Sequence, residues 1–348
     1  MKVLTTREAL DAAAAEWDRL PAAQADPLLS HRWMMAATSL HASDRLHVVC
    51  GHRDSRTVAI APLVATRRNG IHRLEFIGSA VLYEPCDLLA EGDGERDRLC
   101  ESLVALKLPL LLQRVAANSG TEAALRRAAR GRGRLVKATS APSHRVDIQG
   151  DWDAFLAGRS SQLRSGLRRK RKILEQAGPA TFDALRPNPD ELPSVLEEAF
   201  DVEADGWKGA AGTALKLNDR LREFVCDLAH RFAETGDLRV CFLRTGGRAV
   251  AMSILLEFDR RLWEIKIGYR ESAARASPGR LLLWEILHDA FSRGLTSYEF
   301  LGAGDGQQPD WATSSRSLVT LVYYPNTLTG FSAACFGLAG RILRRLRR

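Results

Sequence analysis

The sequence predicts an α+β protein made of two related halves. At 348 residues the chain exceeds the usual size of a single domain. It also contains an internal repeat, because residues 45–63 and 237–255 align without a gap. Around each copy the elements follow the same order: helices, then antiparallel strands, then strand, helix and strand. We therefore expect each half to hold a mixed, mostly antiparallel sheet flanked by helices.

Each copy of the repeat has the pattern of a β-hairpin. An apolar strand leads into a turn, RDSR in the first copy and TGGR in the second, and then into a strand of small and β-branched residues. Matching residues such as Leu46 with Leu238 and Arg56 with Arg248 keep a constant offset. These residues are common ones, so a chance likeness between two hairpins is the alternative to two related halves.

Local periodicity predicts the remaining elements in order. The first half is expected to carry helices at residues 7–20, 31–40 and 94–107 and a strand at 71–78. The second half is expected to carry a basic helix within 159–176, helices at 218–235 and 279–294, and strands at 261–269 and 297–302. We predict a first domain at 1–148, a second at 149–329 and a basic C-terminal helix at 330–348.

Positive charge is concentrated in three stretches that contain no acid. Residues 126–137, 159–172 and 341–348 carry six, seven and five Lys or Arg, whereas the whole chain has a formal net charge of only +8. The rest of the chain is therefore net acidic. Such local charge indicates a binding surface, and not a protein that coats nucleic acid.

The cysteines and histidines predict neither disulfides nor a metal. The six cysteines are widely spaced without a C-x-x-C pair, and the eight histidines show no metal-ligand spacing. The first 20 residues lack the uninterrupted apolar stretch of a signal peptide, and no run of about 18 apolar residues occurs. We expect a cytoplasmic protein.

Residues 261–269 predict a central strand with one charged face. The alternation sets Glu264 and Lys266 against Trp263, Ile265 and Ile267. A strand covered on both sides should be apolar on both faces. The charged face indicates a functional site or, with equal weight, a wetted edge strand or a buried Glu–Lys pair.

The residues that follow this strand predict an anion-binding helix start. Ser277 suits the N-cap, Pro278 the first helical position, and Gly279 lets a ligand approach unpaired backbone amides. Arg275 and Arg280 add positive charge beside them. By itself, S-P-G before a helix is a common capping signal; its place after the charged strand favours a site.

The succession of strand, glycine loop, helix and strand resembles the GNAT-type acyltransferase superfamily, in which this loop holds the pyrophosphate of acyl-CoA. Over nearly its full length the chain is similar to CelD/BcsL-type acetyltransferases, double-GNAT proteins related to the Fem-type aminoacyl transferases. The resemblance rests on AIAPLVATRR, LEFIG and DLLA in the first half, and on SQLRSGLRRKRKILE, GWKG and SPGRLLLWEILHDAFSRGLTSYEFLGAGD in the second. It implies two GNAT-like domains, with residues 275 and 277–280 binding acetyl-CoA or another acyl-CoA.

Two features depart from the family pattern. The phosphate loop has a single glycine, Gly279, where relatives have more, and Gln307 and Gln308 stand near the position of a Tyr-Lys pair. The corresponding part of the first half, residues 78–96, has no recognisable phosphate loop. We expect one active site, in the second half, with a changed acceptor or a weakened activity.

The resemblance implies direct transfer of the acyl group to an amine, with a base to deprotonate the amine and an acid to protonate the leaving thiolate. Glu264 is the first candidate for the base, and Asp305 is the second, although Asp305 followed by Gly is also an ordinary turn. Tyr269 is the candidate acid, with Tyr323 and Tyr324 as alternatives.

The basic stretch predicts an amphipathic helix that binds an anion. Leu163, Leu167 and Leu174 form one apolar stripe, and Arg and Lys crowd the rest. Like charges four residues apart cost a few tenths of a kcal/mol per pair, which favours an anionic partner over a merely solvated face. The partner could be the phosphates of CoA, a nucleotide-sugar, a lipid-linked saccharide, a polysaccharide, an aminoacyl-tRNA or anionic lipid.

Several residues are candidates for binding the acceptor. Arg168 and Arg169 lie on the basic helix, and Lys266 lies on the charged strand. Trp207 could stack on a sugar or base beside Lys208, although a Trp that covers the core next to a Gly turn is an equal alternative.

The leading hypothesis is an acyl-CoA-dependent N-acyltransferase acting on an amine of an anionic, saccharide-linked acceptor in polysaccharide or cell-envelope biosynthesis. One alternative is a Fem-like transferase that uses aminoacyl-tRNA. Another is a non-catalytic module that binds a polyanion or membrane. The apolar and then basic C-terminal segment also suits contact with the inner face of an anionic membrane.

Overall fold

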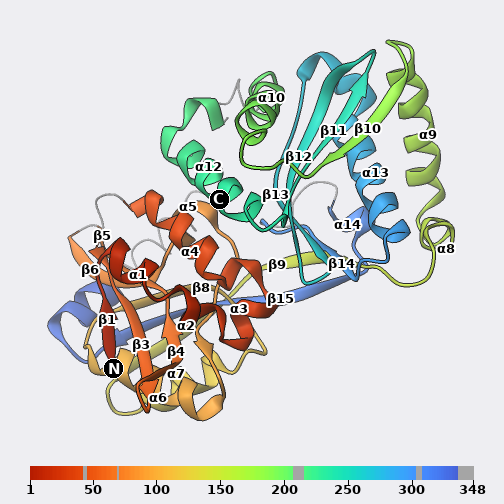
Figure 1. The fold of residues 1–348 in the computed structure, drawn as a ribbon. Coiled ribbons are helices and arrows are strands. Elements are labelled where there is room, and N and C mark those ends of the chain that lie inside the picture. The colour runs from red at the N-terminus through yellow and green to blue at the C-terminus, as the bar shows by residue number, and fades with distance from the viewer. Residues whose placement is uncertain (42–44, 69, 207–214, 303–307, 336–348) are drawn as a thin grey trace. The chain divides into compact units, whose positions relative to one another are not determined.

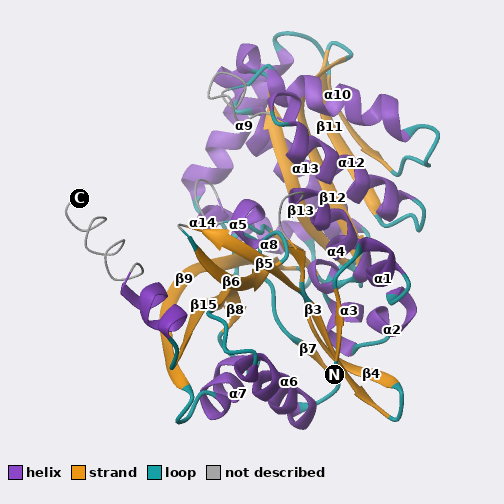
Figure 2. Cartoon of the chain, turned by 90° about the vertical axis from the view of Figure 1, so that its left-hand side faces the viewer, coloured by secondary structure: helices purple, strands orange, loops and turns teal. Residues whose placement is uncertain are grey.

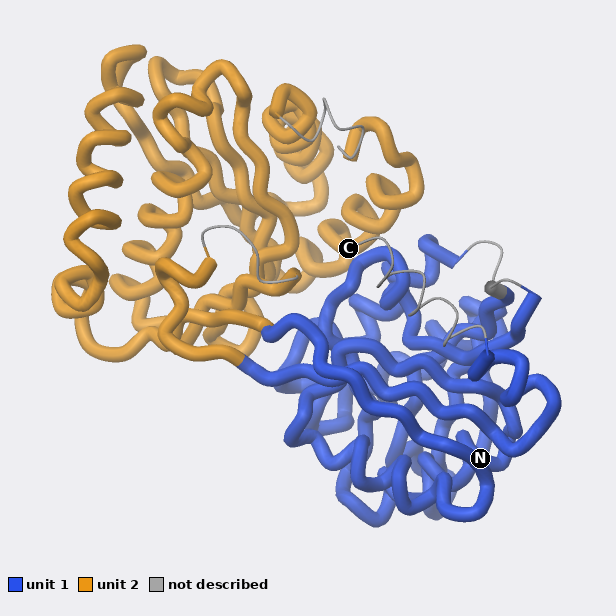
Figure 3. The backbone as a smooth tube through the Cα atoms, turned by 180° about the vertical axis from the view of Figure 1, so that it is seen from behind, with its two compact units in different colours: residues 1–142, 316–348 blue, residues 143–315 orange. Residues whose placement is uncertain are grey.

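A computed structural model gives the fold of the chain (Figure 1). It describes residues 1–41, 45–68, 70–206, 215–302 and 308–335. The chain forms two compact units, shown in two colours in Figure 3. Unit 1 holds Met1–Pro142 and the segment that starts at Arg316, and unit 2 holds Ser143–Ser315. Both combine mixed sheets with flanking helices, which confirms the predicted α+β class.

Unit 1 contains two hydrogen-bonded sets of strands, in the orders β1-β3-β4-β7 and β15-β8-β6-β5-β2. Its strands are β1 Lys2–Leu4, β2 Arg45–Leu46, β3 Val48–Arg53, β4 Arg56–Ala61, β5 Leu63–Arg68, β6 Ile71–Phe76, β7 Leu89–Ala90 and β8 Leu110–Ala116. Its helices are α1 Arg7–Asp11, α2 Ala14–Asp18, α3 Pro21–Ala25, α4 His31–Ala37, α5 Ser79–Leu82, α6 Asp93–Ala105 and α7 Thr121–Ala128, with 3₁₀ turns at Pro27–Leu29 and Thr38–His41. The strands β9 Gly133–Asp147 and β15 Ser314–Pro325 each run from one unit into the other.

Unit 2 has strands in the order β10-β11-β12-β13-β14-β9. These are β10 Ala180–Leu185, β11 Leu238–Thr245, β12 Arg248–Phe258, β13 Arg261–Tyr269 and β14 Ser297–Glu299. The helices are α8 Trp152–Ala157, α9 Ser161–Glu175, α10 Leu192–Ala204, α12 Asp219–Ala233, α13 Pro278–Ser292 and α14 Gln308–Trp311, with 3₁₀ turns at Leu215–Leu217 and Glu271–Ala276. The pairs β10–β11, β11–β12 and β12–β13 are antiparallel, and β13–β14 is parallel.

Both copies of the internal repeat form the predicted hairpins, β3–β4 and β11–β12. They differ in their second strand. In unit 2 it continues to Phe258, whereas in unit 1 it stops at Ala61, and β5 begins at Leu63 in the other set of strands. Pro62 stands at the break, and proline has no N–H for the ladder. One proline thus diverts the chain between the two sheets of unit 1.

The predicted helix at 7–20 is corrected, because the chain forms two short helices there, α1 and α2. Ala13 N–H bonds to the Leu10 carbonyl three residues back, which tightens the turn and ends the first helix. The segment 316–325, which we expected in the second half, falls in unit 1 because β15 pairs with β8. Most of the expected C-terminal helix lies outside the described residues.

Helices cover both faces of the unit 2 sheet, as Figures 1 and 2 show. On one face, α13 and α9 pack in a core that includes Leu167, Leu255 and Leu282. On the other face, α10 packs on β12 and β13. It approaches closely, because a Cβ at Gly268 would lie 2.9 Å from Cα of Glu203. Glycine at 268 is therefore required by packing.

Within the described ranges, no helix is long and apolar enough to cross a membrane.

Candidate functional site

A β-bulge in β13 corrects the expected alternation of its side chains. Leu255 of β12 pairs with Glu264, but its neighbour Ile254 pairs with Lys266, so Ile265 is an extra residue in β13. Adjacent residues of β12 face opposite sides, and their partners do the same. Glu264 and Lys266 therefore lie on opposite faces of the sheet, and the single charged face inferred from the sequence is wrong.

Glu264 lies on the α13 face, where the parallel pairing of β13 with β14 ends. That pairing runs from Arg261 to Trp263 and stops one residue before Glu264. The hydroxyl of Tyr298, on β14, donates a hydrogen bond of 2.5 Å to Oε2 of Glu264. Tyr298 is fully buried, and burial, reinforced by the Glu264 charge, raises its pKa well above the usual value. Tyr298 is therefore a neutral donor that orients the Glu264 carboxylate.

Lys266 lies on the α10 face beside a buried acid. Its Nζ is 3.5 Å from Oε1 of Glu203, a side chain with no solvent exposure, while the Lys266 side chain is 19% exposed. Oε2 of Glu203 accepts a hydrogen bond from Leu215 N. This is the buried Glu–Lys pair that the sequence left open, but the acid is Glu203 and not Glu264. The pair gives Lys266 a structural partner on the face opposite Glu264.

The predicted anion-binding loop forms the start of α13. Pro278 occupies the first helical turn as expected. Ser277 has left-handed backbone angles, φ 50° and ψ 55°, and its side chain makes no capping hydrogen bond, so the expected Ser277 cap is corrected. A side-chain cap requires an extended residue at that position. The Ser277 side chain therefore leaves the backbone amides of the first turn uncapped. The left-handed backbone of Ser277 is strained, and such strain clusters at functional sites.

Tyr269 ends β13 beside this loop. A Cβ built on Gly279 would lie 3.6 Å from Cδ1 of Tyr269 and 3.9 Å from Cδ1 of Ile267, which are ordinary contact distances. Gly279 has no left-handed φ. Its backbone and the ring of Tyr269 thus lie side by side, and small substitutions at 279 fit the fold.

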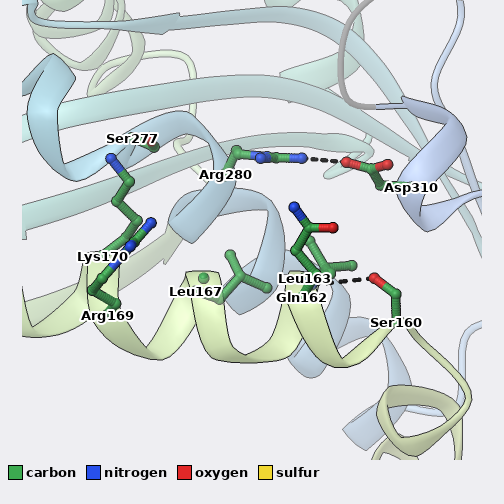
Figure 4. A pocket seen from close by; sticks show the side chains of 10 residues that line it. Ser160, Gln162, Leu163, Leu167, Arg169, Lys170, Ser277, Arg280 and Asp310 are labelled. Atoms are coloured by element: carbon green, nitrogen blue, oxygen red, sulfur yellow. Dashed lines mark hydrogen bonds and ion pairs between the residues drawn. The ribbon is translucent and has the colours of Figure 1, made fainter.

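A pocket of about 280 Å³ opens at the start of α13, between α9 and α14 (Figure 4). Leu163 and Leu167 are its buried apolar residues, and a Cβ at Gly166 would meet nothing within 4 Å. Its charged residues are Arg169, Lys170, Arg280 and Asp310. Arg280 forms an ion pair with Asp310. The pocket is net positive and lies at the positive end of a helix, an arrangement that suits an anion.

The basic helix α9 docks as the sequence predicts, with Leu163, Leu167 and Leu174 buried. Its cations have different surroundings. Arg171 forms ion pairs with Glu175 and Glu285, and Lys170 Nζ donates to the Arg275 carbonyl at 2.6 Å. Within the described part of the chain, Arg168, Arg169 and Lys172 have no acid within ion-pair distance and are exposed. Arg169 lines the pocket at α13, whereas Arg168 lines a different, apolar groove.

Half of the six cations in the other acid-free stretch of the described residues, 126–137, form ion pairs in unit 1. Glu122 pairs with both Arg126 and Lys137, and Asp97 pairs with Arg127. Acids from elsewhere in the chain thus cancel charge that the sequence shows as a run. Arg130, Arg132 and Arg134 have no such partner among the described residues, but Arg169 and Lys170 of α9 line the pocket at the start of α13 and are the better candidates for an anionic ligand.

Some predicted site residues cannot be placed. Asp305, Trp207, Lys208 and Gln307 lie outside the described residues. Tyr323 is placed in unit 1, buried, with its hydroxyl bonded to the Arg132 carbonyl. Among the described residues, no group of three or more His, Cys, Asp or Glu side chains could hold a metal ion.

Sequence reasoning missed Tyr298, Ser160 and Asp310. Tyr298 lies in the predicted strand 297–302, but only the pairing of β14 with β13 brings it to Glu264. Asp310 lies 30 residues after its partner Arg280 and cannot be paired with it by spacing. Ser160 lines the pocket from the N-cap of α9, where its side chain accepts from Leu163 N; S-x-x before an apolar stripe is a capping signal that could have indicated it.

We expect Tyr298→Phe to flatten the alkaline pH dependence of stability. The phenol has a raised pKa in the folded protein, so its contribution is full below the unfolded value of about 10 and is lost as pH rises above it. Urea unfolding between about pH 8 and 11 should show a smaller fall in unfolding free energy for Tyr298→Phe than for the wild type. Tyr324→Phe, at a partly exposed tyrosine, is the control. If the unfolding free energies of wild type and Tyr298→Phe fell in parallel as pH rises, the raised pKa of Tyr298 would be contradicted.

A known protein family matches most of the second half of the chain. Residues 161–310 match the family model described as Acetyltransferase (GNAT) domain. The match covers α9, the bulged strand β13, the start of α13 and Asp310. No curated protein sequence matches the chain.

Solved structures share the fold over most of the chain. The C-terminal DUF2156 domain of a protein named as a lysylphosphatidylglycerol synthetase in Agrobacterium fabrum has a TM-score of 0.60 at 11% identity, covering 93% of this chain and 96% of that one. FemX has a TM-score of 0.58 at 11% identity, and the match covers 93% of this chain and 97% of FemX. L-PGS from Bacillus licheniformis has 0.56 at 13%, covering 92% of each. The chain thus shares the fold of Fem-type and lysylphosphatidylglycerol synthetase C-terminal domains. Residues 161–310 are a GNAT acetyltransferase domain, and the protein is an acyltransferase.

Proposed function

We propose that the protein transfers an acyl group, acetyl above all, from acyl-CoA to an amine of an anionic, saccharide-linked acceptor. The observation that carries the proposal is the positive pocket at the start of α13, inside the matched GNAT domain. Phosphates of the donor would meet the amides of the first turn of α13 and the side chains of Arg169, Lys170 and Arg280. Arg275, whose carbonyl holds Lys170, would support the same loop.

Chemistry would take place along β13. Glu264, oriented by Tyr298, would accept the proton of the amine directly or through water, and the amine nitrogen would then bond to the thioester carbonyl carbon. The carbon–sulfur bond breaks, and the CoA thiolate leaves with a proton from Tyr269, which lies beside Gly279. Asp305 stays the second candidate for the base.

The exposed cations of α9 support an acidic acceptor. Arg168 and Lys172 are exposed, with no acid at ion-pair distance in the described residues, and they flank the pocket-lining Arg169 on the same helix. Trp207, Lys208 and Lys266 are further candidates for acceptor binding, although Lys266 has Glu203 as a partner. The same proposal places the protein in polysaccharide or cell-envelope biosynthesis, as the narrower CelD/BcsL resemblance implies. It also includes a cytoplasmic site of action with contact to the membrane surface.

An aminoacyl-tRNA donor is the second candidate. It is favoured by the fold shared with FemX and with lysylphosphatidylglycerol synthetase domains over more than nine-tenths of the chain. The ion pairs of Arg126, Arg127 and Lys137 take part of the charge of residues 126–137 away from a nucleic acid. A non-catalytic module with the same basic surface is the third candidate.

We expect Gly279→Glu to abolish the binding of acetyl-CoA. The new carboxylate would stand at the start of α13, where the donor phosphates would lie. Isothermal titration calorimetry should show micromolar binding to the wild type, its loss in Gly279→Glu and its partial retention in the isosteric control Gly279→Gln. Thermal unfolding checks that both variants fold; if Gly279→Glu does not, Arg169→Glu on the exposed face of α9 replaces it. No binding of acetyl-CoA to wild type would reject the acyl-CoA proposal in favour of an aminoacyl-tRNA donor or a recruiting module.

We expect Gly166→Ala to raise stability and weaken donor binding together. Replacing glycine in a helix interior stabilises by about 0.5–1 kcal/mol, and the added methyl meets no protein atom within 4 Å. It points instead into space beside the pocket that Gly166 lines. Gly94→Ala in α6, which also meets nothing within 4 Å, should leave acetyl-CoA affinity unchanged. Unchanged affinity in Gly166→Ala would mean that the donor does not approach this part of α9.

We expect Glu264→Gln to lower turnover far more than donor affinity. The amide keeps the shape of the side chain and can still accept a hydrogen bond from Tyr298, but it cannot take a proton. General base catalysis contributes about 10²–10⁴-fold, so kcat should fall within that range while the acetyl-CoA Kd stays constant. The assay follows release of free CoA thiol in a screen of amino sugars. An equal loss of affinity and turnover would contradict a catalytic role, and retained turnover would move the role to Asp305.

A further inference from the structure

A cavity in unit 1 contains a buried guanidinium group that has no hydrogen-bond partner. Arg114, on β8, is 0% exposed, and its Nε, Nη1 and Nη2 atoms are all buried without a partner among the described residues. Its Cζ lies 4.8 Å from the ring centroid of Tyr83. Arg114 lines a cavity of about 230 Å³. A buried charge without a hydrogen bond is costly, and the ring of Tyr83 and the charge of Glu84 are the nearby groups that favour the charged form of Arg114.

The backbone at Arg114 carries a second cost. Thr320 of β15 faces both Gln113 and Arg114, which makes a bulge in β8. Arg114 has a left-handed φ of 55° at that bulge. Glycine is the residue that such a position favours, because a Cβ there is strained. The fold thus holds an arginine where neither the backbone nor the surroundings favour one, as happens at ligand sites.

A second cation faces the same cavity. Arg316 lines it with a side chain that is 32% exposed. Burial, followed by smaller effects that include the charge of Arg316, lowers the pKa of Arg114, whereas Glu84 and Tyr83 act in the opposite direction. Arg316 shares its charge with Asp26 at 3.6 Å, whereas the Arg114 guanidinium has unused donors that an anion between the two could accept.

Both acids of the cavity accept hydrogen bonds from backbone amides, and Asp26 also pairs with Arg316. Asp26 Oδ1 accepts from Leu28 N at 2.9 Å, and its Oδ2 lies 3.6 Å from Arg316. Asp87 Oδ1 accepts from Leu88 N and from Thr121. The remaining oxygen of Asp87 and Nε of Arg96, which also line the cavity, are further buried atoms without a hydrogen-bond partner in the described residues. Several buried polar atoms that lack partners thus meet in one place.

We propose that this cavity binds a small organic oxyanion, a carboxylate or a phosphate monoester, held by Arg114 and Arg316. A guanidinium donates two parallel hydrogen bonds to either group. The apolar residues Leu29, Pro85 and Leu88 line the cavity and would contact the carbon part of the ligand. All lining residues belong to unit 1, so the site is additional to the donor pocket of unit 2. The proposed site would give unit 1, which has no recognisable phosphate loop, its own ligand.

The test is calorimetric titration of the full chain with inorganic phosphate and, separately, acetate, in chloride buffer of matched ionic strength. Because phosphate could also enter the pocket at α13, every titration is repeated in an Arg169→Gln background. Arg114→Met removes the guanidinium and keeps a long side chain. It should lower the affinity for at least one probe by at least about tenfold, since charge-assisted hydrogen bonds are lost. Arg126→Gln, at an exposed ion pair of the same unit, is the control and should change nothing.

The two probes separate the two chemical sources. Binding of phosphate alone indicates a phosphate monoester, and binding of acetate alone indicates a carboxylate. If neither probe binds the wild type, or if Arg114→Met binds as the wild type does, the proposal is overturned. The acetyl-CoA titration tests a different pocket from the phosphate and acetate titrations. If acetyl-CoA does not bind, the effect of Arg114→Met on phosphate and acetate binding can still be interpreted.

A stability measurement separates ligand binding from a structural role. Without ligand, Arg114→Met should melt at a higher temperature than the wild type, because a buried guanidinium that makes no hydrogen bond is gone. A lower melting temperature with unchanged probe binding would assign Arg114 to the fold and overturn the proposal. If Arg114→Met does not fold, Arg316→Gln at the partly exposed side chain replaces it, with the same expected loss of probe binding.

Discussion

The extra residue in β13 is the constraint on which the arrangement of unit 2 depends. Ile265 shifts the register, so that Glu264 faces α13 and Lys266 faces α10. At the same point the parallel pairing with β14 ends, which frees the strand from its neighbour just where the carboxylate stands. Tyr298, in the last paired stretch, then reaches Glu264 with its hydroxyl. Bulges re-aim side chains in this way, and here one bulge separates a candidate base from a structural ion pair.

Some cations of the described chain are paired with acids, and others are not. Lys266 is balanced by Glu203, and residues 126, 127 and 137 are balanced by Glu122 and Asp97. Arg168, Arg169 and Lys172 of α9 have no such partners in the described chain, and Arg280 shares the pocket with Asp310. The pocket at the start of α13 is therefore net positive and carries one acid on its wall.

The two halves share a plan but differ at the positions that matter for binding. In unit 1, Pro62 breaks the strand that stays whole in unit 2, and the bulge lies in β8 and not in the strand after the hairpin. A buried arginine that makes no hydrogen bond in the described residues stands at that bulge.

The sequence by itself determined the local structure. Periodicity in α9, the Pro at the first turn of α13 and the two hairpins are short-range patterns, and they fold as predicted because each is specified by neighbouring residues. The order of these elements was enough to predict the acyltransferase fold. Tertiary structure alone decided the faces of Glu264 and Lys266, since a bulge depends on pairing with another strand. It alone brought Tyr298 to Glu264, Asp310 to Arg280 and Glu122 to Lys137, because contacts between residues far apart in the chain leave no periodic trace in the sequence.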